Sequence, residues 1–340
     1  MKFITTNPAT EEAIAEYEIM DKAAVDERVA RARRAFETWQ ETSLAERTKL
    51  VKKLGKKILA KKQAIAESIT EEMGKPIKDS VREAEKCASI CEYFGKNAKK
   101  LLKDEHVKTE FQKSYVSFQP LGIVGSIMPW NFPASQIIRF MAPSLIAGNV
   151  QIVKPSSTTP NSGGLLIEQL AKDCFPEGVF QAVIGDPTTG TALVESRINA
   201  VSLTGSTEAG IKVAQLAMKD LKKVALELGG SDPFIVLEDA DIDKAVEGAV
   251  TGRFMNCGQS CTAAKRLIIS REIADAFTEK FIEKAKNLRV GDPTDINTDM
   301  GPLVREEQRK KIEGQLSASL GEGAKLLLGG KRIGRKGYFF

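Results

Sequence analysis

Short apolar runs alternate with helical segments from Leu121 to Leu226, and this alternation restricts the possible folds more than any other feature of the chain. Apolar runs that predict strands lie at 123–128, 150–153, 179–184, 200–203 and 223–226. The segments between them that predict helices are 135–147, 164–174, 188–196 and 208–218. This pattern predicts an α/β fold with a doubly wound parallel sheet, which binds ligands beyond the carboxyl ends of its strands.

Further segments lie on either side of this one. Residues 21–105 have apolar side chains at helical spacing, with Asp21 and Ser43 as candidate N-caps, and residues 112–118 alternate as in a strand or hairpin arm. After Leu226 a second α/β segment begins, with strands predicted at 234–237 and 267–269 and helices at 241–254 and 273–288. We therefore divide the chain at 1–118, 119–226 and 227–340.

Composition excludes several classes of protein. The chain has 340 residues, of which 42% are hydrophobic and 28% charged, as in globular proteins. Its net charge of +5 is spread over interleaved lysines and glutamates, so no nucleic-acid partner is predicted. No signal core or membrane-length apolar run is present, and five cysteines make a disulfide framework implausible. Cys87 and Cys91 lack paired histidines, so no metal site is predicted, and a cytoplasmic location with reduced thiols is expected.

A candidate nucleophile is Cys261, which ends the run Asn256-Cys257-Gly258-Gln259-Ser260-Cys261. Glycine and small polar neighbours favour an accessible thiolate, although a buried structural cysteine is the alternative. His106 is the only histidine, so a carboxylate is the more plausible base. Glu227 lies at the junction of two predicted domains, where burial would raise its pKa; the alternative is a hinge with an incidental glutamate.

Three predicted strand ends carry residues suited to nucleotide oxygens. They are Lys154-Pro155-Ser156-Ser157, Gly185-Asp186-Pro187 and Thr204-Gly205-Ser206, in which Ser206 is placed to cap the next helix. No G-x-G-x-x-G fingerprint is present. Together these strand ends indicate a nucleotide site without identifying the nucleotide.

Five ordered motifs give the chain a specific resemblance to the aldehyde dehydrogenase superfamily, and most of all to bacterial and archaeal succinate-semialdehyde dehydrogenases. The motifs are Pro129-Trp130-Asn131-Phe132-Pro133, Lys154-Pro155-Ser156, Thr204-Gly205-Ser206, Glu227-Leu228-Gly229-Gly230 and Asn256-x-Gly-Gln-x-Cys261. The resemblance implies a dinucleotide-binding domain at 119–226 and a catalytic domain at 227–340. It also implies that Cys261 attacks the aldehyde carbon, that Asn131 and the Cys261 N–H form the oxyanion hole, and that Glu227 activates water to hydrolyse the thioester.

The resemblance also implies a cofactor and a substrate. The positions that would line the dinucleotide site are Trp130, Lys154, Ser157, Gly205, Ser206 and Leu228, to which we add the strand-end residues Gly185 and Thr204. Family members that prefer NAD often carry a glutamate at the position of Ser157, so we predict that NADP is accepted as well as NAD, and a preference for NADP stays open. Arg139, two helical turns after Asn131, would bind the substrate carboxylate, unless it forms a surface salt bridge; Arg253 is a weaker candidate.

The chain departs from the family pattern at its end. It stops at Gly337-Tyr338-Phe339-Phe340, before the family's Glu-x-Phe-Gly-Pro segment and the strand used in homodimers and homotetramers. A truncated catalytic domain is therefore expected, and its activity stays open. The alternatives are another short aldehyde or semialdehyde as substrate, a CoA-acylating reaction, a cofactor-independent thiol esterase, and a non-catalytic nucleotide-binding fragment. A redox lock between Cys257 and Cys261 is a further hypothesis, with small filler as its alternative.

Overall fold

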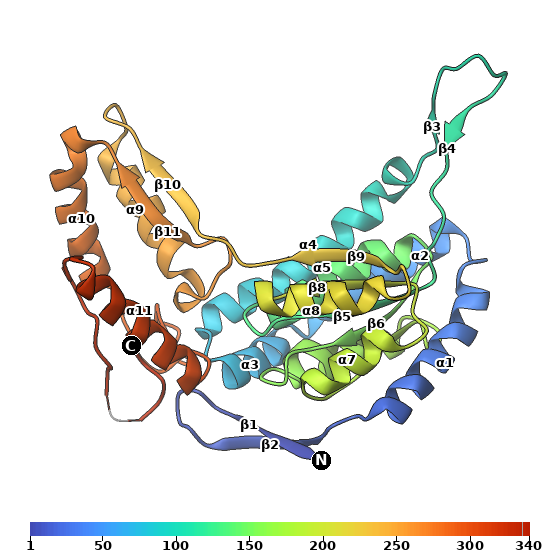
Figure 1. The fold of residues 1–340 in the computed structure, drawn as a ribbon, viewed down its shortest axis with the longest axis horizontal. Coiled ribbons are helices and arrows are strands. Elements are labelled where there is room, and N and C mark those ends of the chain that lie inside the picture. The colour runs from blue at the N-terminus through green and yellow to red at the C-terminus, as the bar shows by residue number, and fades with distance from the viewer. Residues whose placement is uncertain (335) are drawn as a thin grey trace. The chain divides into compact units, whose positions relative to one another are not determined.

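The structure, a computed structural model, describes residues 1–334 and 336–340. The chain forms two compact units, each of which contains a parallel sheet (Figure 1). Unit 1 comprises Met1–Thr5, Glu16–Ser68 and Val81–Leu228. Unit 2 comprises Thr6–Ala15, Ile69–Ser80 and Gly229–Phe340.

The sheet of unit 1 has five parallel strands in the order β7-β6-β5-β8-β9, which confirms the predicted doubly wound sheet. The strands are β5 (Ile123–Ile127), β6 (Val150–Lys154), β7 (Phe180–Ala182), β8 (Ala200–Thr204) and β9 (Lys223–Glu227). Strands β5, β6, β7 and β8 are almost wholly buried, whereas most residues of the edge strand β9 are exposed. Continuous burial explains why the central strands are runs of apolar residues instead of alternating ones.

Helices connect these strands and cover both faces of the sheet. They are α5 (Pro133–Ile146), the π-helical turn η1 (Asn161–Leu165), α6 (Leu166–Lys172), α7 (Pro187–Glu195) and α8 (Thr207–Met218). Parallel crossovers are right-handed, and the strand order runs outward in one direction to β7 and then in the other to β9. Helices α5 and α6 therefore lie on one face, and α7 and α8 lie on the other.

The N-terminal part is helical, as predicted. Its helices are α1 (Lys22–Trp39), α2 (Leu44–Ala60), α3 (Lys62–Met73) and α4 (Ile77–Leu101). The side chains of Asp21 and Ser43 accept the N–H groups of Ala24 and Glu46, so both predicted N-caps are confirmed. The predicted hairpin arm consists of β3 (Glu105–His106) and β4 (Tyr115–Val116), and a two-stranded sheet of β1 (Lys2–Thr6) and β2 (Ala13–Glu18) was not anticipated.

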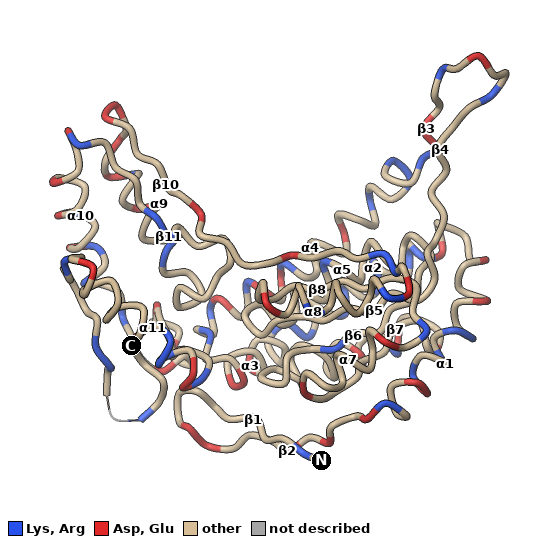
Figure 2. Tube along the Cα trace, viewed as in Figure 1, with Lys and Arg blue, Asp and Glu red and all other residues tan. Residues whose placement is uncertain are grey.

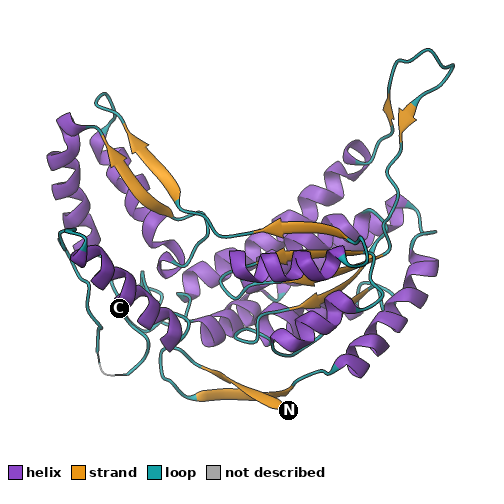
Figure 3. Ribbon diagram, viewed as in Figure 1, coloured by secondary structure: helices purple, strands orange, loops and turns teal. Residues whose placement is uncertain are grey.

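Unit 2 contains the parallel pair β10 (Asp232–Val236) and β11 (Ala264–Ile269), with the helices α9 (Ile242–Phe254) and α10 (Ala274–Lys286) (Figure 3). Its core cluster is made by Val236, Val246, Ala249, Val250 and Phe277. The helices pack together because their apolar residues recur at helical spacing. The short helices η2 (Met255–Gly258) and η3 (Arg271–Ile273) and the helix α11 (Glu306–Gly321) complete the unit.

Charged side chains of both signs are interspersed along the helices of each unit (Figure 2). Many of them form exposed ion pairs, such as Lys22–Asp26 and Lys212–Glu208, one helical turn apart. Among the described residues, no helix combines the length and the apolar character needed to cross a lipid bilayer.

Candidate active site

The carboxyl ends of four parallel strands meet at one edge of the unit 1 sheet. In the strand register Ile127 pairs with Lys154 and with Leu203, and Thr204 pairs with Glu227. Trp130 and Asn131, both partly buried, follow β5 in the turn that leads into α5. The fold thus brings the turn bearing Asn131, the Lys154 and Thr204 strand ends, and Glu227 to the same edge of one sheet.

Lys154 is a buried amine at the end of β6. Its side chain lies near Gly190 of the helix α7, and burial lowers the pKa of this amine to about 8, an effect that the negative charge of Asp186 opposes. Asp186 itself caps α7 by accepting the N–H of Thr188, and its pKa is lowered mainly by hydrogen bonds from Thr188. A buried ammonium group in a strand-end crevice suits the hydroxyl and phosphate oxygens of a nucleotide.

The segment Thr204-Gly205-Ser206 links β8 to α8. Ser206 is the N-cap of α8 and its side chain accepts the N–H of Ala209 at 3.2 Å, as expected. The Gly205 N–H donates to the carbonyl of Glu227 at 3.0 Å, which holds the two strand ends together. The Leu228 side chain packs against Gly210 of α8, and a Cβ added at that glycine would lie only 2.6 Å from it.

Two other residues predicted to bind the cofactor have different surroundings. Ser157 is partly buried in the turn after β6. Gly185 is buried, and a Cβ there would lie 2.0 Å from the hydroxyl oxygen of Thr189. That hydroxyl donates to the carbonyl of Met20 at 2.7 Å, so close packing is sufficient reason for a glycine at position 185.

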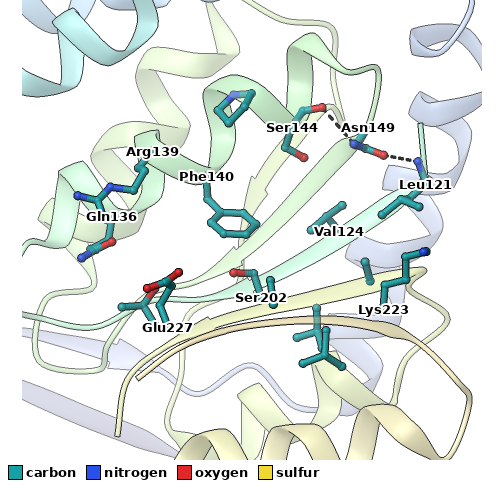
Figure 4. A pocket seen from close by; sticks show the side chains of 16 residues that line it. Leu121, Val124, Gln136, Arg139, Phe140, Ser144, Asn149, Ser202, Lys223 and Glu227 are labelled. Carbon is teal, nitrogen blue, oxygen red and sulfur yellow. Dashed lines mark hydrogen bonds between the residues drawn. The ribbon is translucent and has the colours of Figure 1, made fainter. Parts of the chain in front are cut away.

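Glu227 is exposed at the end of β9, so the expectation that this carboxylate is buried is wrong for the chain as it stands. Strand β9 lies at one edge of the sheet and most of its residues are uncovered by the described residues, in contrast to β7 at the other edge, which is buried. Glu227 and Arg139 line one pocket of about 530 Å³ between α5 and strands β8 and β9. Figure 4 shows Arg139, Gln136 and Glu227 together at one end of this pocket, with Asn149 and Lys223 at the other.

Arg139 is exposed in the structure. Within the described residues its guanidinium forms no hydrogen bond or ion pair, so the alternative of a surface salt bridge has no partner there. The pocket walls are largely apolar and include Phe140, Pro143 and Val124. This cation at an apolar pocket is suited to an anionic group on a small aliphatic molecule.

Cys261 lies in unit 2, in the loop between η2 and β11. Of the five cysteines, all within the described residues, Cys261 alone is exposed. The Lys265 ammonium donates to its carbonyl oxygen at 2.5 Å. Asn256 and Cys257 precede it with φ of 56° and 57°, a left-handed conformation that is rare for residues other than glycine. A left-handed conformation of this kind costs free energy and persists only where the surrounding contacts compensate for it, and it is common at functional sites.

Cys257 is buried, and burial raises the pKa of its thiol to about 12. Its sulfur accepts the N–H of Gly301 at 3.1 Å. A buried, protonated thiol is a poor nucleophile. The environment of Cys257 therefore favours the structural role over the redox lock.

Sequence reasoning missed the contacts that hold the loop. The Arg253 guanidinium donates to the Gly258 carbonyl at 3.2 Å, and burial lowers its pKa, so this arginine braces the loop. The Gln259 side-chain oxygen accepts the N–H of Val304 at 3.1 Å. No local pattern signals these bonds, although the left-handed turn places Gly258 where a glycine is favoured. In the described part of the chain, no group of three or more His, Cys, Asp or Glu residues is arranged to hold a metal ion.

Comparison with known proteins gives consistent matches over the whole chain. Residues 1–340 match the profile of the Aldehyde dehydrogenase family. The "Succinate-semialdehyde dehydrogenase [NADP(+)]" of Mycolicibacterium paratuberculosis is 43% identical over 345 residues, which cover 100% of this chain and 73% of that protein. The solved structure of Gox0499 has a TM-score of 0.96 and 37% identity, covering 100% of this chain and 75% of that one. PnpE in complex with nicotinamide adenine dinucleotide has a TM-score of 0.96 and 36% identity, with 100% and 71% covered.

Proposed function

Because the chain belongs to the aldehyde dehydrogenase family, we propose that it oxidises succinate semialdehyde to succinate, with NADP or NAD as the oxidant. The reaction consumes one water, and the aldehyde carbon loses a hydride and gains an oxygen. The oxidised nicotinamide supplies the hydride acceptor when it is bound. The chain's own residues have to bind the aldehyde, form and break the carbon–sulfur bond, and activate water.

Cys261 is the nucleophile in this proposal. As a thiolate, its sulfur adds to the aldehyde carbon and the carbonyl oxygen becomes an oxyanion. Its exposure, in contrast to the burial of the other four described cysteines, supports this role. After oxidation the carbon is held as a thioester, and its hydrolysis returns the thiolate.

Asn131 stabilises the oxyanion through its side-chain amide. A preorganised donor of this kind typically contributes ~10²–10³ in rate. Glu227 accepts a proton from the water that attacks the thioester. The support for these roles is that the turn bearing Asn131 and the end of strand β9 lie at one edge of the unit 1 sheet.

The residues at the strand ends fit a dinucleotide. Lys154 supplies a buried ammonium, and the amino end of α8 at Ser206 supplies N–H donors suited to phosphate oxygens. Trp130, Thr204, Gly205 and Leu228 would complete the walls of this site. Ser157 carries no charge that would repel a 2′-phosphate, which supports acceptance of NADP, in agreement with the name of the mycobacterial relative.

The proposed substrate, succinate semialdehyde, is inferred from Arg139. A guanidinium without an ion-pair partner among the described residues, in the same pocket as the proposed base, is suited to the carboxylate of a semialdehyde. Charge-assisted hydrogen bonds contribute ~1.5–3 kcal/mol. Because Arg139 is exposed and partly screened by water, we expect the lower end of this range, which is roughly tenfold in KM.

The test measures nicotinamide reduction by absorbance for the chain and for the variants Cys261→Ala and Arg139→Ala. Succinate semialdehyde is compared with butanal, which has the same number of carbons and no carboxylate. We expect Cys261-dependent reduction and a KM for succinate semialdehyde that rises roughly tenfold in Arg139→Ala, whereas the KM for butanal stays unchanged. An equal loss for both aldehydes would refute the role of Arg139 and leave another short aldehyde as substrate.

A further inference from the structure

The first turn of α5 is capped by a residue from α4, a helix that is distant in sequence. The N-cap position is Phe132, whose side chain accepts no hydrogen bond, and the first helical residue is Pro133, which has no N–H. Instead, the Glu83 carboxylate of α4 accepts the N–H of Ala134 at 3.1 Å and the N–H of Ser135 at 2.9 Å. Gln136 then makes the first intrahelical bond, to the carbonyl of Phe132, at 3.0 Å.

Glu83 is almost wholly inside the protein, with 3% of its surface exposed, and the two N–H groups belong to buried residues. A buried carboxylate is costly unless it is hydrogen-bonded, and a helix N-terminus is where a negative charge is most favoured. A cap that only closes a helix is usually a local serine, threonine or aspartate. This helix uses a residue about fifty positions away, which ties its first turn to α4.

The capped turn directly follows Asn131. The two N–H groups that Glu83 binds belong to the third and fourth residues after that asparagine. The remainder of α5 is held by its buried residues Ile137, Ile138 and Met141. Loss of the carboxylate would therefore loosen the start of the helix and the Asn131 turn, while Arg139 further along stays in place.

From this arrangement we propose that Glu83 is a positioning residue that acts through Asn131, an inference that rests on the proposed function of Asn131 as the oxyanion donor. Glu83 touches neither substrate nor cofactor in this role. It holds the backbone from which the Asn131 amide is presented. Because a displacement of about 1 Å can cost on the order of 10² in rate, its removal should lower kcat more than it changes KM.

The test compares Glu83→Ala, Glu83→Gln, Asn131→Ala and the double variant Glu83→Ala/Asn131→Ala, in kcat and KM for succinate semialdehyde. We expect Glu83→Ala to lower kcat about 10–100-fold with little change in KM. Glu83→Gln keeps an oxygen acceptor and should recover much of the loss. The double variant should be no slower than Asn131→Ala, because Glu83 acts through that side chain.

Glu168 offers a matched control. It is another buried glutamate of unit 1, paired with Arg28 at 3.0 Å and remote in sequence from the Asn131 turn. Glu168→Gln should lower the unfolding temperature and leave kcat as it is. If Glu83→Ala slowed the Asn131→Ala background by the same factor as the unaltered chain, or if it changed only the unfolding temperature, the proposal would be overturned.

Amide hydrogen exchange separates this proposal from the proposed function. We expect the amides of Ala134 and Ser135 to exchange faster in Glu83→Ala than in the unaltered chain and in Glu168→Gln. Unchanged exchange would overturn the positioning role, whatever the activity. An unaltered chain that reduces no nicotinamide would refute the proposed function instead, and the exchange result would still decide whether Glu83 holds the start of α5.

Discussion

Replacement of Gly301 by alanine should disturb the loop that contains Cys257 and Cys261 through a backbone contact. A Cβ at this position would lie 2.0 Å from the carbonyl oxygen of Gly74 and 3.3 Å from Pro293, whereas real Cβ contacts almost never fall below 3.0 Å. Since this carbonyl belongs to the backbone, a change of side-chain rotamer cannot relieve the clash. The two segments have to separate by about 1 Å.

The cost can be worked from this contact. Overpacking of a close-packed interior costs ~1–3 kcal/mol. A clash with backbone belongs in the upper half of that range, about 2–3 kcal/mol. For a chain of 340 residues we expect the unfolding temperature to fall by roughly 3–4 °C.

The same displacement should change the accessibility of a thiol. The Gly301 N–H donates to the sulfur of buried Cys257, so movement of the glycine removes that bond and opens the cysteine to reagent. Titration of the folded protein with a chromogenic disulfide should detect one rapidly reacting thiol, Cys261, in the unaltered chain. In Gly301→Ala it should detect two.

Gly314 in α11 provides the control for the substitution itself, because no atom lies within 4 Å of a Cβ added there. Gly314→Ala should raise the free energy of unfolding by about 0.5–1 kcal/mol, as expected for alanine in a helix. The reasoning would be refuted if Gly301→Ala unfolded at the temperature of the unaltered chain and showed a single reactive thiol.

Two further predictions concern the cofactor. Burial lowers the pKa of Lys154 to about 8, so its ammonium form predominates at pH 7 and is progressively lost as the pH rises to 9. The affinity for NADP, measured by fluorescence titration, should fall over this range. Lys154→Met should bind NADP more weakly and without this pH dependence, and an equal dependence in the variant would contradict the assignment. Ser157→Glu should weaken the binding of NADP by roughly tenfold and leave the binding of NAD nearly unchanged, because a carboxylate beside the 2′-phosphate repels it. Steady-state KM values for the two cofactors would show this difference, and an equal loss for both would argue against contact between residue 157 and that phosphate.

The sheet of unit 1 could be predicted because its strands are buried. Residues Ile123–Ile127 and Val150–Lys154 are apolar runs, and a run buried on both faces shows itself in the sequence regardless of its neighbours. The helix Glu306–Gly321 has no buried residue and no apolar face, so it leaves no periodic signal. The short strands Lys2–Thr6 and Ala13–Glu18 were missed for a similar reason, since most of their residues are exposed or partly buried.

The candidate site was predictable to the extent that topology determines it. Parallel strands place their carboxyl ends at one edge, so Lys154, Thr204 and Glu227 could be grouped from their positions along the chain. The burial of Glu227 was predicted wrongly because it depends on what covers an edge strand, which strand order alone does not give. The prediction used the sequence next to the glutamate, and exposure is a property of the whole sheet.

The two thiols of one loop show the same limit of prediction from local sequence. Cys257 and Cys261 lie four residues apart among similar small polar neighbours, and local sequence alone does not rank them by exposure. Cys257 is buried and its sulfur accepts the N–H of Gly301, 44 residues further along the chain, whereas Cys261 is exposed. Glu83 stands in the same relation to the Asn131 turn. In the first case a distant contact binds the thiol that does not react, and in the second it holds the turn that carries Asn131, so substitutions at Gly301 and Glu83 test two contacts that the local sequence does not reveal.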